Sequence, residues 1–220
     1  FGVDGKYTPV IITSSDADTI VPPGVNNAAR VEVYRPLPGE DAKDVTATAT
    51  IKADRAVHKA FPGSVESFMQ RRGDSTIISK GRQLKKSNAA MFKRIEDRYG
   101  VPPGVLLAIW GMETGFGGFL GKENTLSAVA TLAYDCRRSD FFTDQLYAAL
   151  QLVGNGSLSP NARGAAHGEI GQTQFLPRNV VRFGVDGDGN GRIDLVGSKA
   201  DALASTANFL RGHGWSRGGG

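Results

Sequence analysis

The sequence predicts a mainly α-helical fold, with a short extended or β-rich segment before it. Residues 1–60 contain short runs of Val, Ile, Thr and Tyr that proline and glycine residues separate, which is typical of strands and turns. From residue 61 onward, apolar residues recur at helical spacing, and capping residues bound these runs. We therefore divide the chain into residues 1–60, whose role is unknown, and one helical domain over residues 61–220.

The amino-terminal segment contains three runs with the composition of strands. They are residues 7–13, 29–34 and 45–51. Their β-branched and aromatic side chains suit a pleated, half-buried surface. We expect the first helix to begin after them, within residues 53–60.

Helical spacing is clear in residues 87–100. This run opens with a serine cap, carries Met91, Ile95 and Tyr99 on one face, and ends in a glycine. Pro103 then opens a further helix, because proline is tolerated in the first helical turn. Three more helices are expected over residues 125–134, 140–153 and 199–210.

The overall composition, with 40% hydrophobic and 22% charged residues, is that of an ordinary globular domain. No apolar run reaches the length that spans a bilayer, and no signal peptide opens the chain, so we expect a mature or trimmed form. The single cysteine, Cys136, excludes an intrachain disulfide and a cysteine metal cluster.

The chain is mildly basic, with a net charge of +4 and a pI of about 9.3. Much of the positive charge lies in residues 71–98. Such a stretch is either a solvated helical face or a surface for an anionic polymer such as a cell wall. The sequence has no helix-turn-helix, zinc-finger spacing or aromatic RNA-reading motif, so we expect no nucleic-acid partner.

Glu113 is the candidate catalytic residue. At helical spacing it shares a face with Leu106 and Trp110, at the end of an apolar stripe. Burial of a carboxyl group beside an aromatic ring raises its pKa and keeps the group protonated near neutral pH. A protonated carboxylic acid is what general-acid cleavage of a glycosidic bond requires. The alternative is a glutamate near a helix end that faces solvent.

Residues 167–177 (HGEIGQTQFLP) are a candidate ligand-binding wall. Gln172 and Gln174 can hydrogen-bond N-acetyl and hydroxyl groups, and Phe175 can contact the face of a sugar ring. The alternative is an ordinary loop that leads into a short helix.

Residues 186–194 (DGDGNGRID) match the first part of an EF-hand calcium loop. Oxygen-bearing side chains stand at positions one, three and five, a glycine at six and an isoleucine at eight. The predicted side-chain ligands are Asp186, Asp188 and Asn190, and Arg192 would supply its backbone carbonyl. The sequence therefore predicts a calcium site.

The second part of this loop departs from the EF-hand pattern. Position twelve is Gly197 instead of a bidentate glutamate. Asp201, near the head of the next helix, is the best replacement, and Asp194 can act directly or through water. We therefore expect structural calcium binding, with weaker affinity than a calcium sensor has.

Taken in this order, the three segments resemble the MltB family of lytic murein transglycosylases. The similarity is strongest in residues 99–117 (YGVPPGVLLAIWGMETGFG). It continues through residues 168–177 and the EF-hand-like loop of residues 186–197, which we call the acidic loop. It ends in ANFL at 207–210 and GHGW at 212–215. The resemblance implies a lysozyme-like helical fold with an inserted calcium loop, acting on peptidoglycan glycan strands in the periplasm or at the outer membrane.

The resemblance also implies a reaction. Enzymes of this family cleave the β-1,4 bond between N-acetylmuramic acid (NAM) and N-acetylglucosamine (NAG), and they leave a 1,6-anhydro end. Glu113 corresponds to the single catalytic residue, which acts first as acid and then as base. A single carboxylate distinguishes this chemistry from that of the two-carboxylate hydrolases.

Further residues are assigned to substrate binding by the same resemblance. Gln174 and Phe175 match a glutamine–phenylalanine pair of the cleft, where Gln172 also lies. Ile170 and Gly171 shape the same wall. The ANFL motif adds Asn208 to the predicted substrate-binding residues.

Three departures from the family leave alternatives open. Ala165 and Ala166 replace a serine and an aromatic residue, residues 1–60 are unlike the usual amino-terminal region, and the chain stops soon after Trp215, so part of the cleft is expected to be missing. One alternative is a weakly active or inactive peptidoglycan-binding or assembly module. Another is a muramidase, with Glu169 activating water. We expect a monomer, with envelope-assembly proteins as further partners.

Overall fold

The computed structural model describes residues 10–12, 31–33, 45–56, 64–135 and 137–218 of the chain. The chain forms two compact units. The first unit comprises residues 1–58, 121–170 and 176–181, and the second comprises residues 59–120, 171–175 and 182–220. Both units are therefore built from segments that are far apart in the sequence.

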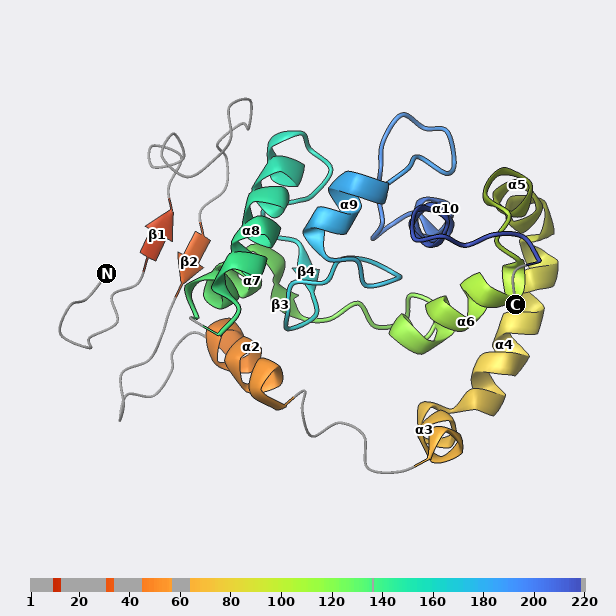
Figure 1. Ribbon diagram of the computed structural model, residues 1–220, viewed down its shortest axis with the longest axis horizontal. Coiled ribbons are helices and arrows are strands. Elements are labelled where there is room, and N and C mark those ends of the chain that lie inside the picture. The colour runs from red at the N-terminus through yellow and green to blue at the C-terminus, as the bar shows by residue number, and fades with distance from the viewer. Residues whose placement is uncertain (1–9, 13–30, 34–44, 57–63, 136, 219–220) are drawn as a thin grey trace. The chain divides into compact units, whose positions relative to one another are not determined.

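Two helices of the first unit pack side by side, α7 (Thr125–Tyr134) and α8 (Ser139–Gly154) (Figure 1). The Oδ1 atom of Asn124 caps α7 by accepting the N–H of Ser127 at 2.9 Å. The two helices share an apolar cluster. Its buried members are Leu126, Val129, Ala130, Leu146, Ala149 and Leu150.

Short strands accompany these helices. β1 (Val10–Ile12) pairs antiparallel with β2 (Val31–Val33), and β3 (Glu123–Asn124) pairs antiparallel with β4 (Arg163–Gly164). β1 and β2 lie inside the first two runs predicted as strands, which confirms their strand character. The rest of those two runs lies outside the described residues, as does Cys136.

The prediction of a third strand over residues 45–51 is wrong, because these residues form the first part of helix α2 (Val45–Ala56). The first helix therefore begins at Val45 instead of within residues 53–60. Thr50 and Asp54, four positions apart, are 0% and 1% exposed, so one helical face is buried, and α2 packs against α7. Tertiary packing here overrides the weak strand preference of β-branched residues.

The second unit contains the larger of the two apolar clusters in the described part of the chain. Its described helices are α3 (Val65–Arg72), α4 (Asp74–Ser87), α5 (Ala89–Tyr99), α6 (Pro103–Thr114) and α10 (Lys199–Gly212) (Figure 1). α5, α6 and α10 pack against one another. Their buried side chains, with Val101 from the connection between α5 and α6, form one cluster that includes Phe92, Ile95, Leu106, Trp110, Leu203 and Ala207.

Most helices agree with the sequence prediction. α6 opens at Pro103 and α7 has the expected bounds, whereas α5 is capped by Asn88 because Ser87 is the last residue of α4. The sequence did not predict α3, α4 or the short α9 (Pro177–Phe183). Among their described residues, α3 buries none and α4 buries only Gly81, so neither shows a strong apolar face.

The basic residues at positions 71–98 are all exposed, on α3, α4 and α5. This agrees with a solvated helical face. None of the helices in the described part of the chain combines the length and apolar character needed to cross a bilayer.

Candidate active site

Glu113 lies in the last turn of α6, which Gly115 ends in a left-handed conformation. Leu106 and Trp110 are buried, with exposed fractions of 0% and 3%, as the apolar stripe predicts. Glu113 itself is exposed, which differs from the expected burial. The core-facing position of the last turn belongs to Thr114, four residues after Trp110 and 4% exposed. The carboxyl group is therefore accessible to a ligand from solvent.

Thr114 joins the Glu113 helix to the candidate ligand-binding wall. Its hydroxyl donates to the carbonyl oxygen of Gln172 at 2.6 Å and accepts the N–H of Gly117 at 2.9 Å. The first of these bonds spans 58 positions of the sequence. Because both bonds are largely buried, they fix the backbone beside Glu113. Thr114 was not among the residues predicted for the site, although a hydroxyl on an apolar helical face was a signal for it.

Gln172 links the same wall to the acidic loop. Its N–H donates to the carbonyl of Leu195 at 2.9 Å, and its side-chain Nε2 donates to the carbonyl of Val196 at 3.0 Å. The side chain is also close to Gly117, where an added Cβ would lie 2.9 Å from Oε1. Gln172 is only 8% exposed. This placement favours a positioning role, and direct contact with substrate stays a prediction.

Two residues of the site segments have strained backbones. Phe116 has a φ of 65° and Gln174 a φ of 55°, and they are the non-glycine residues with positive φ in the described ranges. Such conformations cost about 1–3 kcal/mol and cluster at functional sites. They flank the Thr114–Gln172 hydrogen bond in both segments. The structure thus singles out the same two segments as the sequence.

The side chain of Gln174 is half-buried. Its Nε2 donates to the carbonyl of Gly171 at 2.9 Å, and the carbonyl of Leu120 lies 3.4 Å away. Gly171 has a φ of 75°, and an added Cβ would lie 2.3 Å from the carbonyl oxygen of Leu195. Gly171 is therefore required where the wall meets the end of the acidic loop.

The remaining predicted substrate residues are packed more tightly than expected. Phe175 is 6% exposed, and its ring lies 5.5 Å from that of Phe209. The Nδ2 atom of Asn208 donates to the carbonyl of Phe183 at 3.0 Å. Ile170 is 3% exposed and belongs to the first unit. The second unit therefore holds every predicted substrate residue except Ile170, and sugar contact by Phe175 stays a prediction.

A separate charged cluster surrounds His167 in the first unit. Its Nδ1 lies 3.4 Å from Glu169, and its Nε2 lies 3.8 Å from the buried Asp54, which also pairs with Arg137 and Arg138. Burial raises the pKa of Glu169. The hydrogen bonds from His167 and from its own backbone, together with the His167 charge, lower it by more, so the pKa is below the ordinary 4.5. Glu169 is therefore ionised near neutral pH.

Backbone amides shape the acidic loop around Asp186. Its Oδ1 accepts the N–H of Gly189 at 2.6 Å, and its Oδ2 accepts the N–H of Gly191 at 2.7 Å. The Gly191 bond is the largest influence on the pKa of Asp186, which lies below its ordinary 3.8. The predicted ligand Asn190 accepts the N–H of Arg192 through Oδ1 at 2.9 Å. The loop is therefore wound tightly by its own hydrogen bonds, as an ion-binding turn requires.

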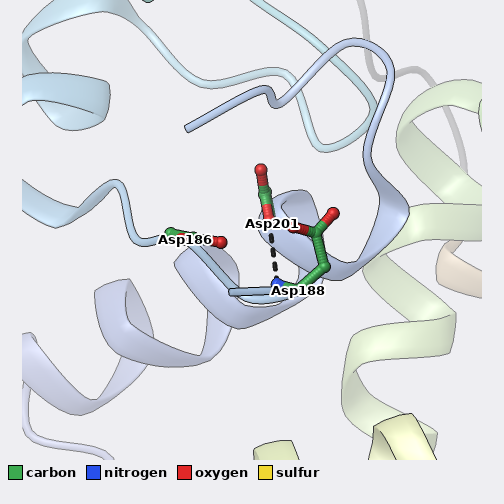
Figure 2. A group of neighbouring side chains, drawn as sticks. All are labelled: Asp186, Asp188 and Asp201. Atoms are coloured by element: carbon green, nitrogen blue, oxygen red, sulfur yellow. Dashed lines mark hydrogen bonds between the residues drawn. The ribbon is translucent and has the colours of Figure 1, made fainter. Parts of the chain in front are cut away.

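Asp201 is drawn into the same loop. It is 0% exposed, and its two oxygens accept the N–H groups of Gly187 and Asp194, each at 2.8 Å. Figure 2 shows its carboxylate gathered with those of Asp186 and Asp188 at the first turn of α10. Oxygens of the three carboxylates lie within 4.8 Å of one another. Like charges this close repel, and a hard cation with oxygen ligands relieves the repulsion.

The donor set thus fits calcium. Three carboxylates converge, and one of them is Asp201, the residue predicted to replace the missing glutamate. Asp194 accepts the N–H groups of Val196 and Gly197 at 2.9 and 2.8 Å through its Oδ1, so that oxygen holds the local turn.

Solved structures define the class of this fold. SltB3 from Pseudomonas aeruginosa, in complex with NAG-NAM-pentapeptide, is 35% identical with a TM-score of 0.72, over 82% of this chain and 50% of that one. The Escherichia coli lytic transglycosylase Slt35, in complex with calcium, is 28% identical with a TM-score of 0.68, over 77% and 55%. The fold is therefore the mainly helical, lysozyme-like fold of lytic transglycosylases, as predicted.

The sequence identifies the family. Residues 34–220 match the transglycosylase SLT domain, so the chain belongs to this family. Membrane-bound lytic murein transglycosylase B from Escherichia coli (strain K12) is 37% identical over 122 residues, which are 54% of this chain and 34% of that protein. The family resemblance is confirmed. The chain spans about a third of this curated relative and about half of the two solved structures.

Proposed function

We propose that this chain is a lytic transglycosylase domain that cleaves the NAM–NAG bond of peptidoglycan and leaves 1,6-anhydro ends. The observation that carries the proposal is the placement of Glu113. It stands exposed at the end of α6, and the Thr114–Gln172 bond ties that helix end to the strained Gln174 segment. The relative SltB3 in complex with a peptide-bearing NAG-NAM ligand supports peptidoglycan as the substrate class.

The proposed reaction uses Glu113 twice. Its proton passes to the glycosidic oxygen as the bond from that oxygen to NAM C1 breaks, and the NAG product leaves with a free hydroxyl. The resulting carboxylate takes the proton of the NAM C6 hydroxyl while that oxygen attacks C1 and closes the anhydro ring. Glu113 ends protonated, and no water is consumed. The hydrolytic alternative would instead need a second carboxylate that activates water, and its products would carry reducing ends.

The test of this proposal is mass spectrometry of the soluble products from purified peptidoglycan. We expect anhydro-ended fragments from the wild type and about a hundredfold to ten-thousandfold fewer from Glu113→Gln, because loss of a general acid–base costs about 10²–10⁴-fold. Glu66→Gln, an exposed site on α3, removes the same charge and should retain full activity.

Each other outcome of this assay has a defined meaning. Reducing-end products would identify a muramidase. Peptidoglycan that sediments with the protein without fragment release would identify the binding module. Equal turnover by the wild type and Glu113→Gln would remove Glu113 from the mechanism.

We further propose that calcium binds the acidic loop through Asp186, Asp188, Asn190, the Arg192 carbonyl and Asp201. The convergence of three carboxylates supports this, and the calcium complex of the relative Slt35 adds to it. The ion would hold the loop, and through Leu195 and Val196 it would hold Gln172 in place. It takes no part in the chemistry at Glu113.

Thermal unfolding with and without calcium tests the metal site. Calcium at a hundred times its Kd stabilises a protein by about 2.7 kcal/mol, so we expect a clear rise in Tm for the wild type. Asp186→Ala should abolish the rise, whereas Asp97→Ala, in an exposed pair with Lys93, should keep it. The site would be disproved by equal Tm values for the wild type in calcium and in chelator.

The cellular setting is proposed on the same basis. The curated relative is named a membrane-bound murein transglycosylase, which supports a periplasmic or outer-membrane-associated location. Envelope-assembly partners and a monomeric state stay predictions.

A further inference from the structure

A pocket of about 470 Å³ lies in the second unit. Three arginines line it, Arg98, Arg182 and Arg211, together with Tyr99, Phe183 and Asn208 among others. None of its lining residues is acidic. The pocket thus concentrates positive charge with no compensating carboxylate in its wall.

The guanidinium groups are held in place by their neighbours. Arg98 lies 5.4 Å from the ring centre of Tyr99, and Arg182 lies 5.1 Å from that of Phe183. The Nη1 atom of Arg211 donates to the carbonyl of Arg98 at 3.3 Å. In the described part of the chain, none of the three arginines forms an ion pair. Their remaining N–H donors are available to a ligand.

Each of these arginines lies in the last turn of its helix, where a cation complements the helix dipole. That effect explains an arginine at one helix end. It does not explain why three helix ends bring their arginines into one pocket, where the like charges repel. A bound anion offsets this repulsion, and guanidinium forks match the geometry of a carboxylate.

The pocket is connected to the candidate substrate wall. The ring of Phe183, which lines the pocket, lies 5.2 Å from Phe209, and Phe209 lies 5.5 Å from Phe175. Asn208 lines the pocket and donates to the Phe183 carbonyl. Two ring contacts therefore link the pocket to Phe175 of the candidate wall, and the peptide of a bound sugar must span this distance to reach the arginines.

We propose that this arginine pocket binds a carboxylate of the peptide that NAM carries in peptidoglycan. The inference rests on the proposed function, because a peptidoglycan substrate supplies the anion. It assigns Asn208, predicted from sequence as a substrate residue, to the peptide rather than to the glycan. Arg182 and Arg211 are the principal ligands, since their forks are fixed from two different helices.

Calorimetric titration with the NAG-NAM-pentapeptide fragment tests the pocket. This fragment lacks the NAM–NAG bond to be cleaved, so binding is measured without turnover. We expect Arg182→Gln and Arg211→Gln each to weaken binding about tenfold, as loss of a charged hydrogen bond does. Arg94→Gln, exposed on α5 outside the pocket, loses the same charge and should bind like the wild type.

The same fragment with its carboxyl groups amidated is the matched ligand. It should bind the wild type about tenfold more weakly, and Arg182→Gln should weaken it no further. Arg182→Lys, which keeps the charge but not the fork, should recover only part of the affinity. Unchanged Tm values for these variants would exclude a folding effect.

Three results would overturn the proposal. They are equal affinity for the free and amidated fragments, an equal loss in Arg94→Gln, or displacement of both fragments alike by inorganic phosphate. Failure of the proposed function is separate, since it appears as absent cleavage. Glycan strands stripped of peptide should be cleaved equally by the wild type and Arg182→Gln.

Discussion

The acidic loop and the Glu113 segment are both organised by hydrogen bonds to the backbone, but over different distances in the sequence. The bonds of Asp186 and Asp201 reach residues at most 14 positions away, whereas the Thr114–Gln172 bond spans 58. The loop therefore carries its geometry in its own spacing. The Glu113 segment acquires its geometry only when the second unit has folded, because the partner of Thr114 lies 58 positions away in the sequence.

This difference predicts that glycines in the two regions respond differently to alanine. Gly171 combines a φ of 75° with a Cβ position 2.3 Å from the Leu195 carbonyl oxygen, while Gly189 in the loop has a φ of 80° and open space around it. We expect Gly171→Ala to lower the free energy of unfolding by about 3 kcal/mol. Gly189→Ala bears only the backbone strain and should cost about 1 kcal/mol.

Urea unfolding of the two variants measures the difference. An equal loss of unfolding free energy in Gly171→Ala and Gly189→Ala would mean that the wall and the end of the acidic loop can separate without cost. In that case Gly171 would not define a fixed joint between the two regions.

Thr114→Val sharpens the comparison within the Glu113 segment. Valine keeps the volume but leaves the carbonyl of Gln172 and the N–H of Gly117 without a buried partner, which costs about 1–3 kcal/mol. Because the bond positions the catalytic helix end, we expect kcat to fall about tenfold or more at a temperature where the variant is fully folded. The measurements are urea midpoints and product rates.

Thr114→Ser is the matched control. Because it keeps the hydroxyl, it should retain most of the stability and most of the kcat of the wild type. A Thr114→Val enzyme with the kcat of the wild type would show that this bond supports stability alone.

The same contrast explains what could be predicted from sequence. The convergence of Asp186, Asp188 and Asp201 could be predicted, because the spacing of the first two is the signal and Asp201 is a nearby carboxylate on the following helix. The mostly apolar helices α6 and α7 were predicted from the sequence, whereas the mostly polar α3 and α4 were not. The strand predicted at residues 45–51 failed because the burial of Thr50 and Asp54 is decided by tertiary contacts.

The candidate site was predicted as segments that the structure does bring together, but the placement of its individual residues was not predicted. Sequence periodicity put Glu113 on the buried stripe, although the last turn gives that place to Thr114. It also assigned Gln172 to substrate, although the structure engages its side chain with the backbone at Val196. Both differences arise from contacts between segments that lie 58 and 24 positions apart in the sequence. No local sequence pattern contains such contacts.

The smallest expected effect concerns pH and the acidic loop. The N–H groups of Gly191 and its neighbours hold the pKa of Asp186 below 3.8 in the folded chain. A carboxylate with a depressed folded-state pKa stabilises the protein above its unfolded pKa, and this contribution disappears as pH falls through the folded value. In chelator, the wild type should therefore lose stability relative to Asp186→Asn below about pH 4. Parallel Tm curves for the two proteins between pH 5 and pH 2, roughly, would show that the loop is not held by the ionised carboxylate. Because these bonds lie within six residues, the effect should persist in Thr114→Val, where the active-site segment has already lost its long-range bond.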